Sequence, residues 1–303
     1  MMHLQVAAYH HAGRSEAALS GIKLTVAPGT LTVVAGGSGS GKSTLAGVLA
    51  GYLPGRTGGR LAGSLQLDGR LVEYDGGSEP PVVDLREWSR QVACVPQDAR
   101  NYLSLVRPTV EEELAFGLEN AGTPRQLMQD KVRRSAAMFG LESLLERNPA
   151  RLSGGQERLV ALAAASITGA PILVLDEPLA GLDQAAAGLV KQAVGRLREE
   201  GTAVVLLTQQ LDALSETAER ALLLQDGRAV AEGLDSVRRR APEAGVIMRT
   251  TAPPAWPEDR AAIPRAQGRP HRAPLLSYED VGYSYPSIGG RPAQGWLPPG
   301  FGS

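Results

Sequence analysis

The chain is poor in cysteine, in aromatic residues and in net charge. Its 303 residues include one cysteine, Cys94, which excludes an internal disulfide bond and a zinc site built only from cysteines. Aromatic residues make up 4% of the chain, so a core has to be built mainly from leucine, valine and alanine. The formal net charge of −1 lacks the basic excess of a general nucleic-acid binder. We therefore expect a globular protein with an aliphatic core and no nucleic-acid partner.

Long apolar runs and a targeting segment are also missing. The first residues, 1–5, lack the charged and apolar regions of a signal peptide. The most apolar stretch, 159–175, is interrupted by Gly-Ala-Pro at 169–171, which favours a buried helix, a turn and a buried strand over a membrane span. We expect a protein that is soluble by itself and works in the reducing cytosol.

The strongest positive signal is the glycine-rich segment 33–44. Gly36 and Gly41 stand five residues apart and are followed by Lys42 and Ser43, with an apolar strand-like run before them and a helix-prone run after them. Backbone N–H groups and a helix start in this order predict a phosphate-binding loop, with Lys42 spanning the β- and γ-phosphates of a nucleotide and Ser43 binding Mg²⁺. The predicted loop consists of Gly36, Gly37, Ser38, Gly39, Ser40, Gly41, Lys42, Ser43 and Thr44. The alternative is a flexible Gly/Ser turn.

Two further segments predict catalytic groups. The apolar run 172–175 ends in Asp176 and Glu177, of which the first is placed to hold Mg²⁺ through its water shell and the second to polarise an attacking water. Gln97 follows a short strand and is placed to reach Mg²⁺ or that water. By itself the carboxylate pair is also compatible with an ordinary strand that has an acidic exposed end.

A fourth segment, 152–156, places a serine and two glycines at the start of a helix. Ser153, Gly154, Gly155 and Gln156 predict a second anion-binding nest. The alternative for this segment is a simple N-cap beside a flexible turn. Alternating apolar strands and helices between about residues 31 and 207 predict an α/β fold with a mainly parallel sheet, preceded by N-terminal antiparallel strands.

In this order, five motifs resemble the ATPase subunit of an ATP-binding cassette (ABC) transporter over residues 2–235: GGSGSGKST, VPQD, LSGGQ, ILVLDEP and AGLD. The resemblance implies a P-loop NTPase core in a domain over 1–240, with an inserted α-helical subdomain at about 98–160. It implies ATP and Mg²⁺ as cofactors and a head-to-tail pair with a second ABC domain, identical or different. Each ATP then lies between one domain's phosphate loop and the other's Ser153 to Gln156.

The same resemblance assigns roles in this chain's own ATP site. Lys42 and Ser43 serve it together with Gln97, Asp176 and Glu177. The aromatic ring that stacks on adenine falls at His11, or at Tyr9 if the alignment slips by two residues. The family also places a γ-phosphate-contacting histidine where this chain has Gln209. A glutamine amide cannot carry an imidazolium charge, so we expect ATP binding to survive and turnover to be slow.

Residues 97–98 and 109–120 resemble more closely the energy-coupling factor importers of vitamins or transition metal ions. That resemblance implies a transmembrane scaffold subunit, a separate substrate-capture membrane subunit, and a cytoplasmic location on the inner face of the cell membrane. The alternative for 109–120 is a capped amphipathic helix that does not indicate a subfamily. We expect the apolar side chains Tyr102, Leu103, Leu105 and Val106 to form an exposed patch that docks on the scaffold.

The C-terminal part differs in character. Seven prolines among Arg, Ala and Gly over 241–274 predict a linker, partly extended and disordered. Residues 275–303 resemble the N-terminal strands when Tyr283 is set on Tyr9, which predicts the remnant of a second ABC domain; an unrelated tail is the alternative. Three other functions stay open: a nucleotide-holding, poorly hydrolysing partner, a soluble tandem ABC protein outside transport, and a damaged gene product.

Overall fold

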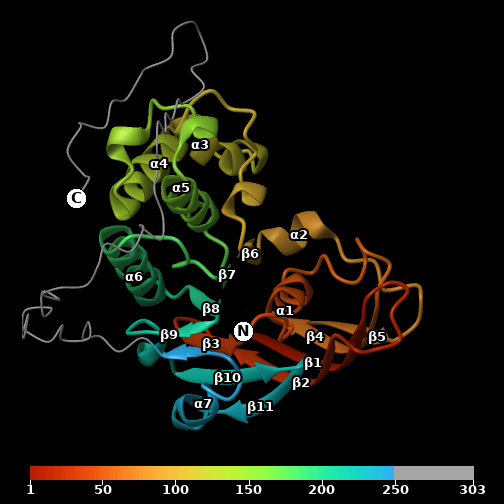
Figure 1. The fold of residues 1–303 in the computed structure, drawn as a ribbon. Helices are drawn as coiled ribbons and strands as arrows, with labels where there is room; N and C mark the ends of the chain where they lie inside the picture. Colours follow the sequence, from red (N-terminus) through yellow and green to blue (C-terminus); the bar gives the residue numbers. More distant parts are fainter. Residues whose placement is uncertain (249–303) are drawn as a thin grey trace, which may run out of the picture. The chain divides into compact units, whose positions relative to one another are not determined.

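The computed structural model describes residues 1–248, which form a ten-stranded sheet packed against helices (Figure 1). The strands of this sheet are β1 (Met2–His10), β2 (Leu19–Val26), β3 (Leu31–Gly36), β4 (Arg60–Leu67), β5 (Arg70–Asp75), β6 (Val92–Val95), β7 (Ile172–Asp176), β8 (Ala203–Thr208), β10 (Arg220–Gln225) and β11 (Arg228–Glu232). A two-stranded sheet pairs β9 (Gln210–Leu211) with β12 (Ile247–Met248). The α-helices are α1 (Lys42–Leu49), α2 (Leu85–Ser89), α3 (Val110–Asn120), α4 (Arg125–Phe139), α5 (Gly154–Ile167), α6 (Gln184–Glu199) and α7 (Leu234–Arg240).

The large sheet has the strand order β5-β4-β1-β2-β11-β10-β3-β8-β7-β6. The run β10-β3-β8-β7-β6 is parallel, whereas β2, β1, β4 and β5 pair antiparallel. The expected α/β class is confirmed: a mainly parallel core follows N-terminal antiparallel strands. In the parallel part, all residues of β3, β7 and β8 are buried, as continuous apolar strands between two covered faces should be.

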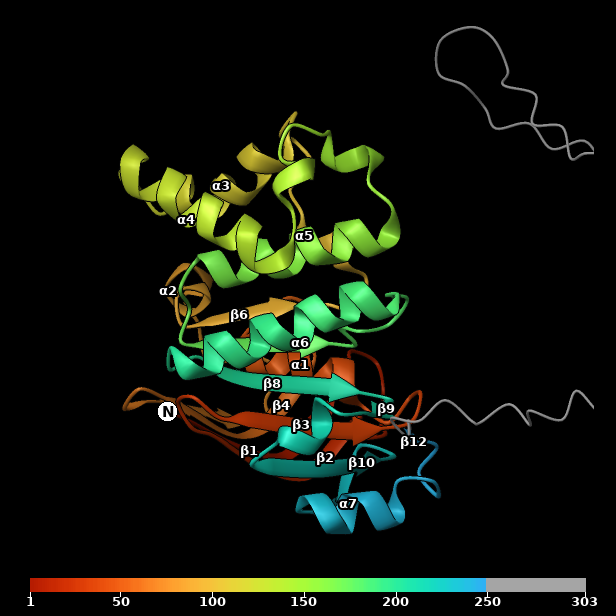
Figure 2. The ribbon, with the colours of Figure 1, turned by 90° about the vertical axis from the view of Figure 1, so that its left-hand side faces the viewer.

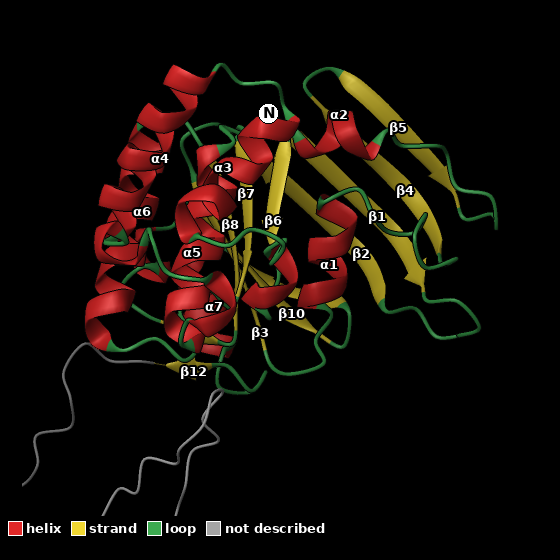
Figure 3. Ribbon diagram, turned by 90° about the horizontal axis from the view of Figure 1, so that it is seen from above, coloured by secondary structure: helices red, strands yellow, loops and turns green. Residues whose placement is uncertain are grey.

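Alternate residues of the central strands face two separate cores. On β3, Val33 and Ala35 belong to the core under α3 to α7, and Val34 belongs to the core that includes α1 and the antiparallel strands. This alternation follows from the two-residue period of a strand. Figure 2 shows α5 and α6 stacked beside the strands, with α3 and α4 further out. Figure 3 shows α1 and α2 on the side of the antiparallel strands and α3, α4, α5 and α6 grouped by the parallel ones.

Helices α3, α4 and the start of α5 occupy the range 98–160 that was expected to be a helical subdomain. Thr109 caps α3 by accepting a hydrogen bond from the Glu112 N–H at 3.3 Å. Asp183 caps α6 in the same way through the Ala186 N–H. In the described part of the chain, no helix combines the length and apolar character needed to cross a bilayer.

The predicted apolar patch at 102–106 is only partly correct. Leu103 is 7% exposed and Tyr102 packs against the core, whereas Val106 is 73% exposed. The buried Glu113 carboxylate accepts hydrogen bonds from the backbone N–H and hydroxyl of Ser104 and from the N–H of the next residue, which has a φ of 55°. This turn directs the earlier apolar side chains inward and leaves Val106 outside.

The packed part of the chain also continues beyond the expected domain boundary at residue 240. Ala241 is fully buried, Val246 is 4% exposed, and β12 pairs with β9. Buried aliphatic side chains interleave here with prolines and glycines, which is why composition alone suggested a linker. The rest of the predicted linker, 249–274, and the predicted remnant at 275–303 lie outside the described residues.

Candidate functional site

The carboxyl ends of four parallel strands meet at one edge of the sheet, and every predicted site segment of this chain's own ATP site except the N-terminal aromatics follows one of these ends. The phosphate loop follows β3, Gln97 follows β6, Asp176 closes β7 with Glu177 next, and Gln209 follows β8. In open α/β sheets this edge is where ligands bind. A cavity of about 470 Å³ opens here and is lined by the loop residues 38–44 and by those four side chains.

The phosphate loop wraps the first residues of α1. Gly41, with a φ of 102°, is the residue before the helix, and a Cβ on it would approach the Leu19 side chain to 2.8 Å. A Cβ on Gly36 would lie 2.4 Å from the Ser40 hydroxyl. Glycine is therefore required at both ends of the loop, because one position needs left-handed backbone and the other leaves no room for a side chain.

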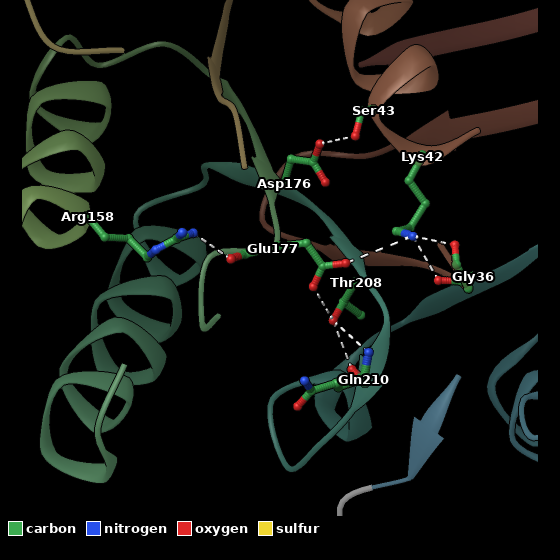
Figure 4. Close-up of polar contacts among 9 residues, drawn as sticks. Gly36, Lys42, Ser43, Arg158, Asp176, Glu177, Thr208 and Gln210 are labelled. Atoms are coloured by element: carbon green, nitrogen blue, oxygen red, sulfur yellow. Dashed lines mark hydrogen bonds and ion pairs between the residues drawn. The ribbon is translucent and has the colours of Figure 1, made fainter. Parts of the chain in front are cut away.

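Lys42 lies inside this loop and is 5% exposed (Figure 4). Its ammonium group donates to the carbonyls of Gly36 at 2.8 Å and Gly37 at 2.9 Å, and it lies 3.9 Å from a carboxylate oxygen of Glu177. Burial lowers the pKa of Lys42, an effect opposed by Glu177 and Asp176. The ammonium is held by two neutral carbonyls, which a triphosphate can replace with charged oxygens.

Asp176 and Glu177 carry buried oxygens with no hydrogen-bond partner. Ser43 donates its hydroxyl to Asp176 at 2.6 Å, and Thr208 donates to Glu177 at 3.4 Å; the other carboxylate oxygen of each acid accepts no hydrogen bond, and that of Glu177 is the oxygen 3.9 Å from the Lys42 ammonium. Burial raises the pKa of both acids, and Lys42 opposes this in each case. Glu177 also has a φ of 52°, so the carboxylate stands on a left-handed, strained residue.

This arrangement fits Mg²⁺. Among residues 1–248, no three His, Cys, Asp or Glu side chains gather as a metal cage. Mg²⁺ does not need one, because it keeps several waters and usually takes one or two protein oxygens together with substrate phosphates. Ser43, Asp176 and Gln97 would hold it, and the unpaired buried oxygen of Asp176 is the observation that supports the fit.

The adenine end of the cavity distinguishes the two aromatic candidates. His11 is exposed and lines the cavity, so it is the ring available for stacking. Tyr9 is fully buried and does not line the cavity, so its assignment as an ATP-contacting ring is wrong. The Tyr9 hydroxyl lies 3.4 Å from Nδ1 of His11 and their rings meet edge to face, which makes Tyr9 a support for His11.

Ser153, Gly154, Gly155 and Gln156, which we call the signature residues, lie away from this cavity. Ser153 caps α5 and forms a capping box with Gln156, and Gly154 is exposed. The simple N-cap interpretation is therefore correct within this chain. It does not conflict with anion binding, since the glycine N–H groups at the helix start stay accessible to a ligand from outside.

Sequence reasoning missed several residues of the cavity wall. Glu16, Ala17 and Ala18 come from the loop after β1, and Asp226-Gly227 is the turn between β10 and β11. Asp-Gly is a strong hairpin signal, but only the sheet order places this turn beside the phosphate loop, where the Gly227 N–H donates to the Ser40 carbonyl.

Comparisons with known proteins agree with this geometry. A family model described as ABC transporter matches residues 19–180. The chain is 35% identical over 223 residues to an energy-coupling factor transporter ATP-binding protein of Streptococcus pneumoniae, covering 73% of this chain and 76% of that protein. It is 33% identical over 216 residues to one of Methanothermobacter thermautotrophicus, covering 71% and 65%.

Other relatives and solved structures show how much of each protein's length this similarity covers. The chain spans 38% of the length of the relatives from Bacillus thuringiensis, Bacillus anthracis and Bacillus cereus, which it matches at 36% identity over 224 residues. A dimeric ATP-binding cassette with bound ADP and phosphate matches with a TM-score of 0.63 at 24% identity, covering 77% of this chain and 98% of that one. The cbiO1 protein of Clostridium perfringens matches with a TM-score of 0.63 at 22% identity, covering 81% and 92%. From its residues, its geometry and these matches, the chain belongs to the ABC transporter family.

Proposed function

We propose that this chain binds ATP with Mg²⁺ and hydrolyses it as one of two paired cassettes that power an importer of the energy-coupling factor type, for a vitamin or a transition metal ion. The observation that carries the nucleotide part is the meeting of Lys42, the Ser43–Asp176 pair and Glu177 at one cavity. The names of the Streptococcus and Methanothermobacter relatives support the importer part.

In this function the loop N–H groups and Lys42 bind the triphosphate, and His11 stacks on the base. Ser43, Asp176 and Gln97 would hold Mg²⁺, which when bound would neutralise negative charge on the triphosphate. Glu177 orients the attacking water and takes its proton; burial favours this role because it moves the pKa of the carboxyl toward working pH. Gln97 and Gln209 line the same cavity and contact the water or the γ-phosphate.

The partners are a second ABC domain, a transmembrane scaffold subunit and a substrate-capture membrane subunit, with the cassettes on the inner face of the cell membrane. The accessible start of α5 supports the pairing, since Ser153 to Gln156 lie outside this chain's own cavity and remain free to contact a partner's ATP. The dimeric form of the structurally similar cassette with ADP and phosphate agrees with this pairing. The docking site for the scaffold is proposed at the turn that Glu113 stabilises, where Val106 is the exposed apolar side chain.

Lys42→Ala tests the nucleotide part. The ammonium group makes charged hydrogen bonds worth about 1.5–3 kcal/mol to a triphosphate, so ATP affinity measured by calorimetry should fall at least tenfold, that is by about 1.4 kcal/mol or more. Lys191→Ala is the matched control, because Lys191 pairs with Asp212 outside the cavity. Equal ATP affinity for wild type and Lys42→Ala would contradict the assignment.

A second candidate function is a nucleotide-holding cassette that closes the dimer while another site hydrolyses ATP. Gln209 favours it, because this side chain stands at the cavity where the resembled family has a histidine. If Gln209 only slows hydrolysis, Gln209→His should raise turnover at saturating ATP about five- to thirtyfold with little change in ATP affinity. Equal or lower turnover of Gln209→His would favour the holding function.

A further inference from the structure

Arg158 binds the backbone of two residues of the ATP site from outside the cavity. It lies on the second turn of α5, and its guanidinium group donates to the carbonyl of Glu177 at 2.6 Å and to the carbonyl of Gln97 at 2.8 Å. Figure 4 shows the side chain reaching from α5 to the residue after β7. Arg158 is itself half-buried and does not line the ATP cavity.

The two carbonyls belong to the residues at the hydrolytic end of the site. Glu177 follows β7 and Gln97 follows β6, and these strands are hydrogen-bonded neighbours. One guanidinium therefore bridges the two chain segments that carry Glu177 and Gln97. It also holds the carbonyl of Glu177 while that residue keeps a φ of 52°, a conformation that an L residue adopts only when its surroundings impose it.

The charge on Arg158 is used only for these carbonyls. Among the described residues, Arg158 makes no ion pair within 4.0 Å. Burial lowers the pKa of Arg158, whereas the nearby Asp98, Glu177 and Asp176 favour its charged form. A surface ion pair requires only that two opposite charges lie close together, not that two donors of one group reach two separate carbonyls. The planar guanidinium, with two donors that diverge toward separate acceptors, is what the site requires, and a lysine ammonium is a single point donor.

The same helix carries the signature residues. Ser153 caps α5, and Arg158 follows within the first two turns, so the two are joined by rigid helical backbone. Movement of the helix start when Ser153 to Gln156 contact a partner's ATP must therefore displace the guanidinium as well. Through Arg158 that displacement reaches Glu177 and Gln97 without passing through this chain's own nucleotide.

We propose that Arg158 is a positioning residue that couples the signature end of α5 to the placement of Glu177 and Gln97 for water attack. The proposal rests on the proposed function, since it concerns the hydrolysis step of the same site. In the resulting picture, contact with the partner's ATP at one interface sets the hydrolytic geometry of the other.

Arg158→Met and Arg158→Lys, in the full chain with its partner cassette, test the proposal. Arg158→Met should lower kcat about tenfold or more and leave the ATP dissociation constant and KM within about twofold. Arg158→Lys keeps the charge and the aliphatic stem, so it should recover part of the loss. Arg100→Met is the matched control: Arg100 also links the segment after Gln97 to α5, but through an exposed ion pair to Glu157 that contributes little.

The results distinguish a failure of the proposed function from a failure of the positioning role of Arg158. If wild type hydrolyses no ATP, the proposed function fails before the variants are compared. If wild type is active and Arg158→Met has the same kcat, or loses ATP affinity in proportion to kcat, the positioning role is overturned.

A double-mutant cycle with Ser153→Ala then tests the coupling, since this change weakens the signature contact with the partner's ATP. If coupling runs through Arg158, Ser153→Ala should cost less turnover in Arg158→Met than in wild type. Additive losses would overturn the coupling. If Arg158→Met does not fold, Arg158→Lys in the same cycle gives the answer.

Discussion

The segment after α7 ties together the phosphate loop and the residue after β8, and this connection can be cut by one substitution. The Gly37 N–H donates to the Ala244 carbonyl at 3.1 Å, and the Ile247 N–H donates to the Gln209 carbonyl at 2.8 Å. Burial raises the pKa of the Glu177 carboxyl, and the nearby backbone of Gln209 opposes this rise. Backbone hydrogen bonds therefore connect β12 to Gln209, the residue whose backbone lies near Glu177.

Ile247→Pro removes the N–H group that donates to the Gln209 carbonyl. The Ile247 side chain is 55% exposed, so the change removes little packing. It leaves the Gln209 carbonyl without its donor, at a cost of about 1–3 kcal/mol. For a domain of this size each kcal/mol lowers Tm by about 2–4 °C, so the expected fall in Tm is about 2–12 °C. Turnover should fall as well, because the peptide that contacts Glu177 is released.

Met248→Pro is the matched control. In a parallel pair alternate residues bond to the neighbouring strand, and Ile247 is the residue that bonds to β9, so the next N–H faces away from it. Thermal denaturation of the full-length variants without nucleotide gives the comparison. An equal Tm for Ile247→Pro and wild type, or an equal fall for both proline variants, would refute this account of the segment.

Two other predictions follow from exposure and charge. Val106→Asp should abolish co-purification with the membrane scaffold and leave Tm within about 1–2 °C, whereas Val82→Asp, at a side chain that is 95% exposed, should preserve assembly; retained assembly of Val106→Asp would contradict the docking site. Burial raises the pKa of Asp176 above its ordinary 3.8, so the folded state binds this proton more tightly than the unfolded chain, and the ionised carboxyl lowers stability at neutral pH. This cost is relieved as pH falls through the raised pKa toward 3.8. Asp176→Asn, measured without nucleotide or Mg²⁺, should therefore raise Tm at about pH 7.5 by an amount that shrinks toward about pH 4; a gain that does not change with pH would show that charge burial is not its cause.

The site residues that the sequence predicts, and that the structure brings together at one cavity, are those whose type follows from the ligand they are proposed to bind. A phosphate needs the glycines and Lys42, and a metal with an attacking water needs Asp176 and Glu177; each requirement selects a residue type at a fixed place after an apolar strand. Burial of β3, β7 and β8 was predictable for a similar reason, since an unbroken apolar run fits a strand that is covered on both faces.

The features that the sequence did not predict depend on backbone partners. Arg158 binds two carbonyls, the segment 244–247 binds one N–H and one carbonyl, and Glu113 binds the N–H groups of a turn. Every residue offers a carbonyl and nearly every residue an N–H, so no residue type in the partner marks such a contact. Tyr9 shows the same limit: it lies within β1 and is fully buried, whereas His11 follows the last residue of β1 and is exposed, and the end of that strand is fixed by its pairing with β2 and β4. In the sequence Arg158 and Tyr9 therefore look like an ordinary arginine and an ordinary core tyrosine, and only the fold shows that each contacts residues that line the cavity.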